Sequence, residues 1–176
     1  SIGADLNPLL QDPGFVLHPP ILYGGYTGCL MLTSLVLGWA WGHDQPLSLQ
    51  PIRRLLLVAM ALLTMGITLG SWWAYHVLGW GGVWFWDPVE NVSLMPWLLL
   101  MMSLHHLRLK YLNAWGVAAL MVMAMVMVSL IILGVFLVRS GVLVSVHTFA
   151  ADATRGLYLL SMLLVIWLGC ALVMMR

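Results

Sequence analysis

Charged residues are scarce in this sequence. Only 7% of its 176 residues are charged and 62% are hydrophobic, whereas a water-soluble domain carries about 25% charged residues. This composition excludes a soluble globular protein. Seven Lys and Arg stand against six Asp and Glu, so no basic surface is available to follow a phosphate backbone, and we expect no nucleic-acid partner.

Cysteine is also rare. Cys29 and Cys170 both lie in apolar runs, and no CxxC or CxxCH motif occurs. The chain therefore has neither a redox dithiol nor a covalent haem attachment site of its own, and we interpret both thiols as helix packing. The sequence starts with Ser1, and no basic segment with a cleavage site precedes the first apolar run. We interpret it as part of a longer protein.

Long hydrophobic runs, by contrast, are abundant. A helix needs about 20 apolar residues to cross a bilayer, and five candidate spans are found at residues 21–41, 55–75, 89–107, 114–138 and 157–175. We predict an all-α membrane protein, a single transmembrane domain over residues 1–176 with about five transmembrane helices. The third span begins in an aromatic, acidic segment, so we expect it to enter the bilayer from a ledge at the membrane interface.

The positive charges predict the orientation of the spans. Lys and Arg stay on the cytoplasmic side more often than not, and five of the seven fall on one face under strict alternation: Arg53, Arg54, Arg108, Lys110 and Arg176. The opposite face, with only Arg139 and Arg155, is predicted to be extracytoplasmic. It receives the N-terminal segment, the tryptophan-rich segment, and the loop with His147. His18 and His76 also fall on this face.

The segment WGGVWFWDPVEN, residues 80–91, is the most unusual stretch. Trp72, Trp73, Trp80, Trp84, Trp86 and Trp97 put six indoles into 26 positions. Tryptophan gathers at membrane interfaces in any case, but an anchoring belt gains little from so many. Neighbouring glycines at 79, 81 and 82 leave room for a flat group to approach the backbone. We infer a ledge for a planar, apolar ligand.

The sequence DPVE, residues 87–90, predicts the start of a helix. Asp87 fits an N-cap, Pro88 the first helical position, and Glu90 the third, which is a capping-box arrangement. This interpretation accounts for both carboxylates without catalysis. It also predicts that the cap and the tryptophan ledge form one rigid unit.

Haem is a planar ligand that uses histidine, because imidazole nitrogens coordinate its iron. His18 and His147 are each expected just beyond the end of a span on the ledge side, and Pro19 and Pro20 would stiffen the backbone beside His18. Arg139 or Arg155 would pair with a haem propionate. An ion pair with Asp152 or a lipid phosphate is an equally good alternative for these arginines.

Two further histidines, His105 and His106, fall inside the third span, where an ionisable residue is a functional candidate. They differ by about 100° around the helix, so only one can easily face the bundle interior. A single histidine cannot supply both axial ligands of a buried b-type haem. A second ligand would have to come from outside this chain or be absent.

Three stretches, LNPLLQDPGFVLHPP (6–20), GSWWAYHVLGWGGVWFWDPVENVSLMPW (70–97) and RSGVLVSVHTFA (139–150), resemble the core of the cytochrome c-type biogenesis proteins of the CcmF type, including their nitrite-reductase branch. The resemblance implies a "WWD" segment, about residues 70–97, that holds haem transiently at the outer face of the bacterial inner membrane, facing the periplasm. By motif position it implies that His18 and His147 bind this haem and that His105, eight residues after the Pro96–Trp97 pair, binds a b haem.

The resemblance also implies an activity. These proteins act as a cytochrome c haem lyase component, which joins haem to the reduced CxxCH thiols of an apocytochrome c. The implied partners are a haem chaperone, thiol-reducing maturation subunits, the apocytochrome, and another subunit or segment that completes the b-haem site. Trp80, Trp84, Trp86, Asp87 and Arg139 are the expected further haem contacts. An alternative is an electron-transfer subunit that exchanges electrons with quinone through b haem.

Overall fold

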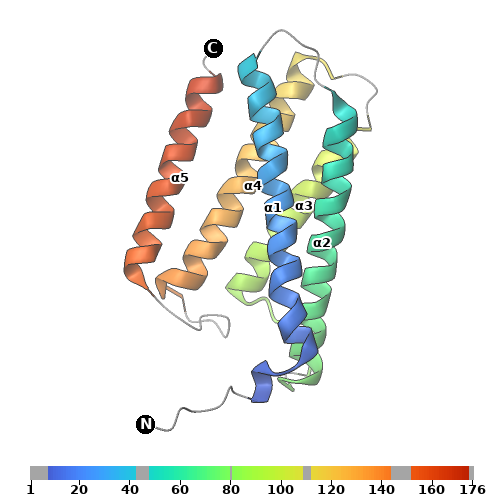
Figure 1. Ribbon diagram of the computed structural model, residues 1–176, viewed down its shortest axis with the longest axis vertical. Helices are drawn as coiled ribbons and strands as arrows, with labels where there is room; N and C mark the ends of the chain where they lie inside the picture. Colours follow the sequence, from blue (N-terminus) through green and yellow to red (C-terminus); the bar gives the residue numbers. More distant parts are fainter. Residues whose placement is uncertain (1–7, 43–47, 80, 109–111, 144–151, 175–176) are drawn as a thin grey trace.

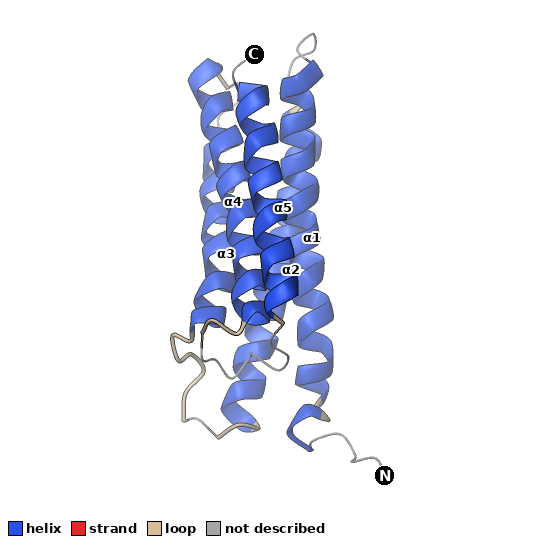
Figure 2. Cartoon of the chain, turned by 90° about the vertical axis from the view of Figure 1, so that its left-hand side faces the viewer, coloured by secondary structure: helices blue, strands red, loops and turns tan. Residues whose placement is uncertain are grey.

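The computed structural model describes residues 8–42, 48–79, 81–108, 112–143 and 152–174. A short 3-10 helix, η1 (Pro8–Leu10), precedes five α-helices: α1 (Pro13–Gly42), α2 (Leu49–His76), α3 (Pro88–His106), α4 (Ala114–Ser140) and α5 (Ala153–Met174). No strand occurs among the residues described (Figure 2). The predicted all-α class is confirmed, and each predicted span corresponds to one helix.

Four of these helices are long and apolar enough to cross a membrane: α1, α2, α4 and residues 154–172 of α5. A 27-residue helix such as α4 is about 40 Å long, more than the roughly 30 Å of a hydrocarbon core. Helix α3 has 19 residues and is not among the four, which agrees with the expectation that its span begins at the membrane interface. The chain is a multi-pass membrane protein.

The helices run side by side, alternating in direction, as an elongated bundle (Figures 1 and 2). Helix α1 packs most extensively on α2, and α4 contacts α1, α3 and α5. The start of α1 and the end of α2 project together beyond the ends of the other helices (Figures 1 and 2). We call this end of the bundle, where α3 also starts and α4 ends, the site end (Figure 1).

The core lies between α1, α2, α3 and α4. Its fully buried side chains include Leu32, Leu56, Leu63, Leu100 and Met127. Many other large apolar side chains point outward, as a lipid solvent requires; Leu157 of α5, for example, is 69% exposed. Cys29 and Cys170 are both buried free thiols, which agrees with a packing role.

Glycines bring α1 and α2 close together. A Cβ atom on Gly28 would lie 2.8 Å from the Cβ of Ala59, and one on Gly66 would lie 2.8 Å from the Cα of Leu22. Such contacts leave no space for larger side chains. Small residues at membrane helix interfaces allow close van der Waals packing of the backbones, which is a main source of helix association in lipid.

Helix α1 begins earlier than the sequence predicted. It starts at Pro13 rather than at residue 21 and contains both Pro19 and Pro20. Asp12 caps it, since its Oδ1 accepts the N–H of Gly14 at 2.7 Å. The placement of His18 beyond the end of a span was therefore wrong. Prolines are tolerated inside membrane helices when neighbouring groups satisfy the freed carbonyls, so the Pro19–Pro20 pair does not end the helix.

Candidate functional site

His18 lies at the interface of α1 with α2. Its Nδ1 is 2.6 Å from the carbonyl oxygen of Gly66. A carbonyl can only accept, so Nδ1 carries the proton and Nε2 is the basic nitrogen, the form in which imidazole binds a metal. A Cβ on Gly70 would lie 2.7 Å from Cε1 of the imidazole. The ring therefore occupies space that exists because residue 70 has no side chain.

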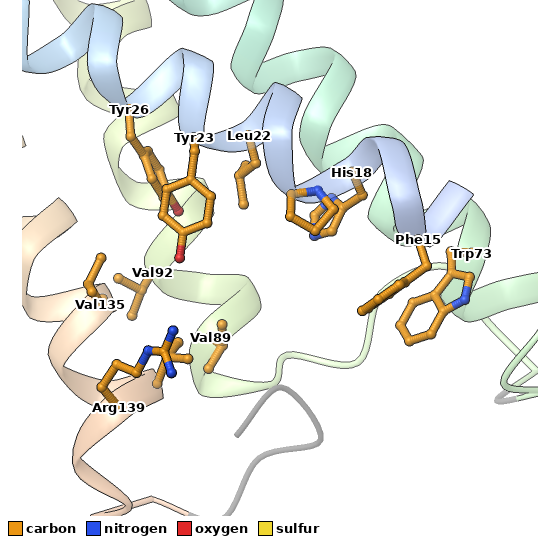
Figure 3. A pocket seen from close by; sticks show the side chains of 13 residues that line it. Phe15, His18, Leu22, Tyr23, Tyr26, Trp73, Val89, Val92, Val135 and Arg139 are labelled. Atoms are coloured by element: carbon orange, nitrogen blue, oxygen red, sulfur yellow. The ribbon is translucent and has the colours of Figure 1, made fainter. Parts of the chain in front are cut away.

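A cavity of about 250 Å³ adjoins His18 between α1, α2, α3 and α4. Its walls are mostly apolar, from Phe15, Leu22, Trp73, Val89, Val92, Val135 and others, and Figure 3 shows the polar groups converging on it. His18, Tyr23 and Tyr26 come from α1, and the guanidinium of Arg139 faces them from α4 (Figure 3). The structure thus brings two sequence-predicted site residues, His18 and Arg139, to one cavity.

Sequence reasoning missed Tyr23 and Tyr26. Residues 15, 18, 22 and 26 follow the three- and four-residue spacing of one helical face. This spacing is present in the sequence, but it indicates a shared helix face only when residues 13–20 are taken as part of the helix.

The arginines predicted to bind propionate have different surroundings. Arg155 forms an ion pair with Asp152, with Nε 3.2 Å from Oδ2, which is the alternative raised for these arginines. Arg139 lines the cavity instead. Of the two, Arg139 is placed to meet a ligand carboxylate.

The DPVE segment caps α3 as predicted. Oδ1 of Asp87 accepts the N–H of Val89 at 2.8 Å, and Oε2 of Glu90 accepts the N–H groups of Asp87 at 3.2 Å and Phe85 at 3.0 Å. The side-chain amide of Asn91 donates to the carbonyl of Trp86 at 3.0 Å. Glu90 and Asn91 together hold the end of the tryptophan segment against the first turn of α3.

The tryptophans divide into two groups. Trp73 is 6% exposed and packs on Phe15, with ring centroids 4.9 Å apart, while Trp97 donates to Oγ1 of Thr64 at 2.8 Å. These two stabilise the bundle. Trp86, by contrast, is 71% exposed and has a positive φ of 58°, a conformation that costs about 1–3 kcal/mol and persists only when neighbouring groups hold it.

Trp84 is half-buried and lies next to the exposed Trp86. Its ring packs edge-on against Trp86, with centroids 6.3 Å apart. Its buried Nε1 and the Oδ1 of Asn91 have no hydrogen-bond partner among the described residues. A buried indole N–H without an acceptor is costly, so this donor fits a ligand oxygen. Trp80 and His147 lie outside the described residues.

His105 and His106 separate at the opposite end of the bundle. His106 is half-buried and its Nε2 is 2.7 Å from the carbonyl of Gly116 on α4. His105 is exposed, and its Nδ1 is 2.9 Å from the carbonyl of Met101, which leaves Nε2 as the basic nitrogen. Both line an open, apolar groove of about 730 Å³ between α3 and α4, with Met101, Met102 and Met123.

The residues at the site end fit haem chemically. The cavity offers a basic imidazole nitrogen, a guanidinium, two tyrosines and apolar walls. A 250 Å³ cavity is smaller than the roughly 300–1,000 Å³ of sites that enclose a ligand. It can therefore enclose only part of a large planar group.

Fold and site together define an all-helical membrane protein with a histidine-bearing, aromatic cavity at one end. The chain belongs to the family described as Cytochrome C assembly protein, whose model matches residues 2–143. The resemblance found in the sequence is thereby confirmed.

Individual relatives agree with this assignment. The chain is 48% identical to the Cytochrome c-type biogenesis protein CcmF of Haemophilus influenzae, covering 93% of this chain and 26% of that protein. It is 45% identical to the Cytochrome c-type biogenesis protein NrfE of the same organism, over 90% of this chain and 25% of the relative. It is also similar to a solved structure named Cytochrome c Heme Lyase CcmF, with a TM-score of 0.73, 26% identity and coverage of 93% and 26%. The chain thus spans about a quarter of the length of these relatives.

Proposed function

We propose that this chain forms the haem-handling part of a cytochrome c haem lyase. It holds haem, the substrate, at the outer face of the bacterial inner membrane and promotes its attachment to the CxxCH thiols of an apocytochrome c. The observation that carries the proposal is the meeting of His18 and Arg139 at one apolar cavity, whose wall includes Val89 in the first turn of α3. Family membership supports a role in cytochrome c assembly.

Each residue has a defined part in this proposal. Nε2 of His18 binds the iron from one face, and His147 binds it from the other. Arg139 pairs with a propionate, since its planar fork matches a carboxylate. Trp80, Trp84 and Trp86 supply the flat surface, and Asp87 fixes that surface by capping α3. Residues 70–97 act as one segment on the periplasmic side of a single transmembrane domain.

This reaction requires no nucleophile from this chain. In the reaction, the sulfur of an apocytochrome thiol bonds to a carbon of the haem vinyl group and its proton passes to the other vinyl carbon, so the addition balances without a leaving group. The protein contributes orientation of the reacting atoms, which alone can supply a large share of a rate enhancement. A haem chaperone, thiol-reducing maturation subunits and the apocytochrome are the partners that this reaction requires.

A second haem, of b type, is proposed at the groove that holds His105. His105 is exposed there, whereas His106 is bonded to the carbonyl of Gly116. A second ligand to the iron would come from another subunit or another segment. When bound, the b haem would supply electron transfer through its iron. This chain would present the imidazole of His105 in an apolar groove.

The test is the absorption spectrum of the purified protein, alone and with its partners. We expect a haem spectrum in the wild type and its loss or shift in His18→Ala and His147→Ala. Arg139→Ala should retain less haem after purification, while Arg155→Ala, which removes an arginine already paired with Asp152, should retain the wild-type amount. A colourless wild type, or equal retention in both arginine variants, would contradict the proposal.

A further inference from the structure

The imidazole of His18 rests on two glycines of α2. Gly66 and Gly70 are four residues apart, so they lie one above the other on the same helix face. The carbonyl of Gly66 is 2.6 Å from Nδ1 of His18. A Cβ built on Gly70 would lie 2.7 Å from Cε1, 2.8 Å from Nδ1 and 3.2 Å from Nε2 of the same ring. The ring thus occupies the side-chain space of residue 70.

The carbonyl of Gly66 fixes the proton on the ring. This oxygen has two lone pairs and can accept from His18 in addition to its own helix bond. Because Nδ1 is the donor, Nε2 carries the lone pair. A hydrogen bond of this kind to a metal-binding histidine sets its tautomer, orients the ring and raises the basicity of the binding nitrogen.

The height of the ring above α2 is set by the backbones. A Cβ on Gly66 would lie 2.8 Å from the Cα of Leu22 and 2.9 Å from its nitrogen. Leu22 is one turn beyond His18 on α1. The two helices are therefore in contact at this point, which leaves the imidazole little freedom to tilt away from the carbonyl.

We propose that Gly66 and Gly70 form an imidazole seat that positions His18 for an iron ligand: Gly66 by accepting the Nδ1 proton, and Gly70 by leaving room for the ring. Both are positioning residues, because they act through His18. The inference deepens the proposed haem site and rests on that proposal. It gives α2 a role in the site that does not depend on any side chain.

Gly70→Ala is the informative variant. The three atoms nearest to the new methyl group all belong to the imidazole of His18, so the ring must move while the helix backbones can stay in place. At Gly66 it would meet the backbone of Leu22, so helix packing would change as well. Gly24→Ala is the matched control: it adds the same methyl group at the same helix pair, but its Cβ lies 3.5 Å from Leu62, an ordinary contact.

The first measurement needs no haem. In protein with ¹⁵N-labelled histidine, purified without haem, nitrogen chemical shifts report which ring nitrogen carries the proton, and the His18 signal is identified by its absence in His18→Ala. We expect His18 with the proton on Nδ1 in the wild type and in Gly24→Ala, and a mixed or reversed population in Gly70→Ala. Wild type with the proton on Nε2 would overturn the inference.

The second measurement uses the full chain with haem in native membranes. Loss of the hydrogen-bond partner that orients a metal-binding histidine typically lowers the affinity for the metal by about 10–100-fold. We expect Gly70→Ala to bind haem with an affinity lower by a factor in that range and with a shifted reduction potential. Added free imidazole should restore its spectrum, as it should for His18→Ala. Gly24→Ala should behave as the wild type.

The two proposals fail in different ways. If His18→Ala leaves the haem spectrum unchanged, the proposed site is wrong, whatever the glycine variant does. If His18→Ala loses the spectrum but Gly70→Ala matches Gly24→Ala in affinity, potential and tautomer, the site stands and the seat is refuted.

Discussion

Nε2 of His76 lies 3.1 Å from Oδ2 of Asp12, which joins the last residue of α2 to the cap of α1. Nδ1 of His76 is 2.6 Å from the carbonyl of Trp72, and the two rings stack with centroids 3.9 Å apart. Both ring nitrogens thus face acceptors, and the doubly protonated imidazolium satisfies both. The contact fastens together the projecting ends of the two helices that hold His18.

This contact makes stability at the site end depend on pH. Desolvation alone raises the pKa of the Asp12 carboxyl, but hydrogen bonds from His76 and from the N–H of Gly14, together with the charge of His76, lower it below its ordinary value of 3.8. A lowered pKa means that the carboxylate stabilises the fold above pH 3.8 and that this contribution is lost as the pH falls through the folded-state pKa.

Asp12→Asn tests this prediction. Asparagine caps a helix as well as aspartate does, so the variant keeps an acceptor for Gly14 and removes only the charge facing His76. We expect a lower thermal midpoint than the wild type at pH 5–6, with the difference shrinking toward zero as the pH falls below about 3.8. In a His76→Ala background, Asp12→Asn should change the thermal midpoint very little, because the effects of substitutions at two contacting residues do not add. Equal midpoints for wild type and Asp12→Asn at pH 5–6 would refute the pairing.

The cap of α3 gives a second prediction. Oε2 of Glu90 accepts two backbone N–H groups, from Phe85 and Asp87. Glu90→Ala leaves both without that acceptor and should lower the unfolding free energy by about 1 kcal/mol, the usual cost of losing a cap. Glu90→Gln keeps an acceptor oxygen and should cost less. Thermal unfolding in detergent compares the two variants, and equal losses would mean that the charge, not the hydrogen bonds, matters.

Substitutions of the two adjacent histidines of α3 should have different effects on the b-haem spectrum. Under the proposed b-haem site, His105→Ala removes an axial ligand and should abolish the b-haem spectrum of the complex. His106→Ala breaks only the contact with the carbonyl of Gly116 and should retain the spectrum with modest loss of stability. Absorption spectra of both variants, reduced and oxidised, provide the measurement. The reverse pattern would assign the ligand to His106.

Sequence predicted those parts of the fold that local chemistry decides. The start of α3 follows from Asp87, Pro88 and Glu90, which interact within one turn. The start of α1 was placed at residue 21, where the apolar run begins, whereas the helix starts at Pro13 behind the Asp12 cap and contains Pro19 and Pro20. The seat of His18 was not predictable, because it joins positions 52 residues apart through a glycine that carries no side chain.

Close packing of α1 on α2 yields the last prediction. A Cβ on Gly28 would lie 2.8 Å from the Cβ of Ala59 and 3.2 Å from its Cα, whereas one on Gly38, in the same helix, meets nothing within 4 Å. Overpacking a tight interface costs about 1–3 kcal/mol, so Gly28→Ala should lower the thermal midpoint.

Gly38→Ala adds the same methyl group in open space, and alanine favours a helix over glycine by up to about 1 kcal/mol, so the midpoint should stay or rise. Opposite shifts in the two variants, measured by thermal unfolding in one detergent, would locate the helix contact at residue 28. If both variants shift alike, the change reflects helix propensity, and the close approach of α1 to α2 at Ala59 does not hold.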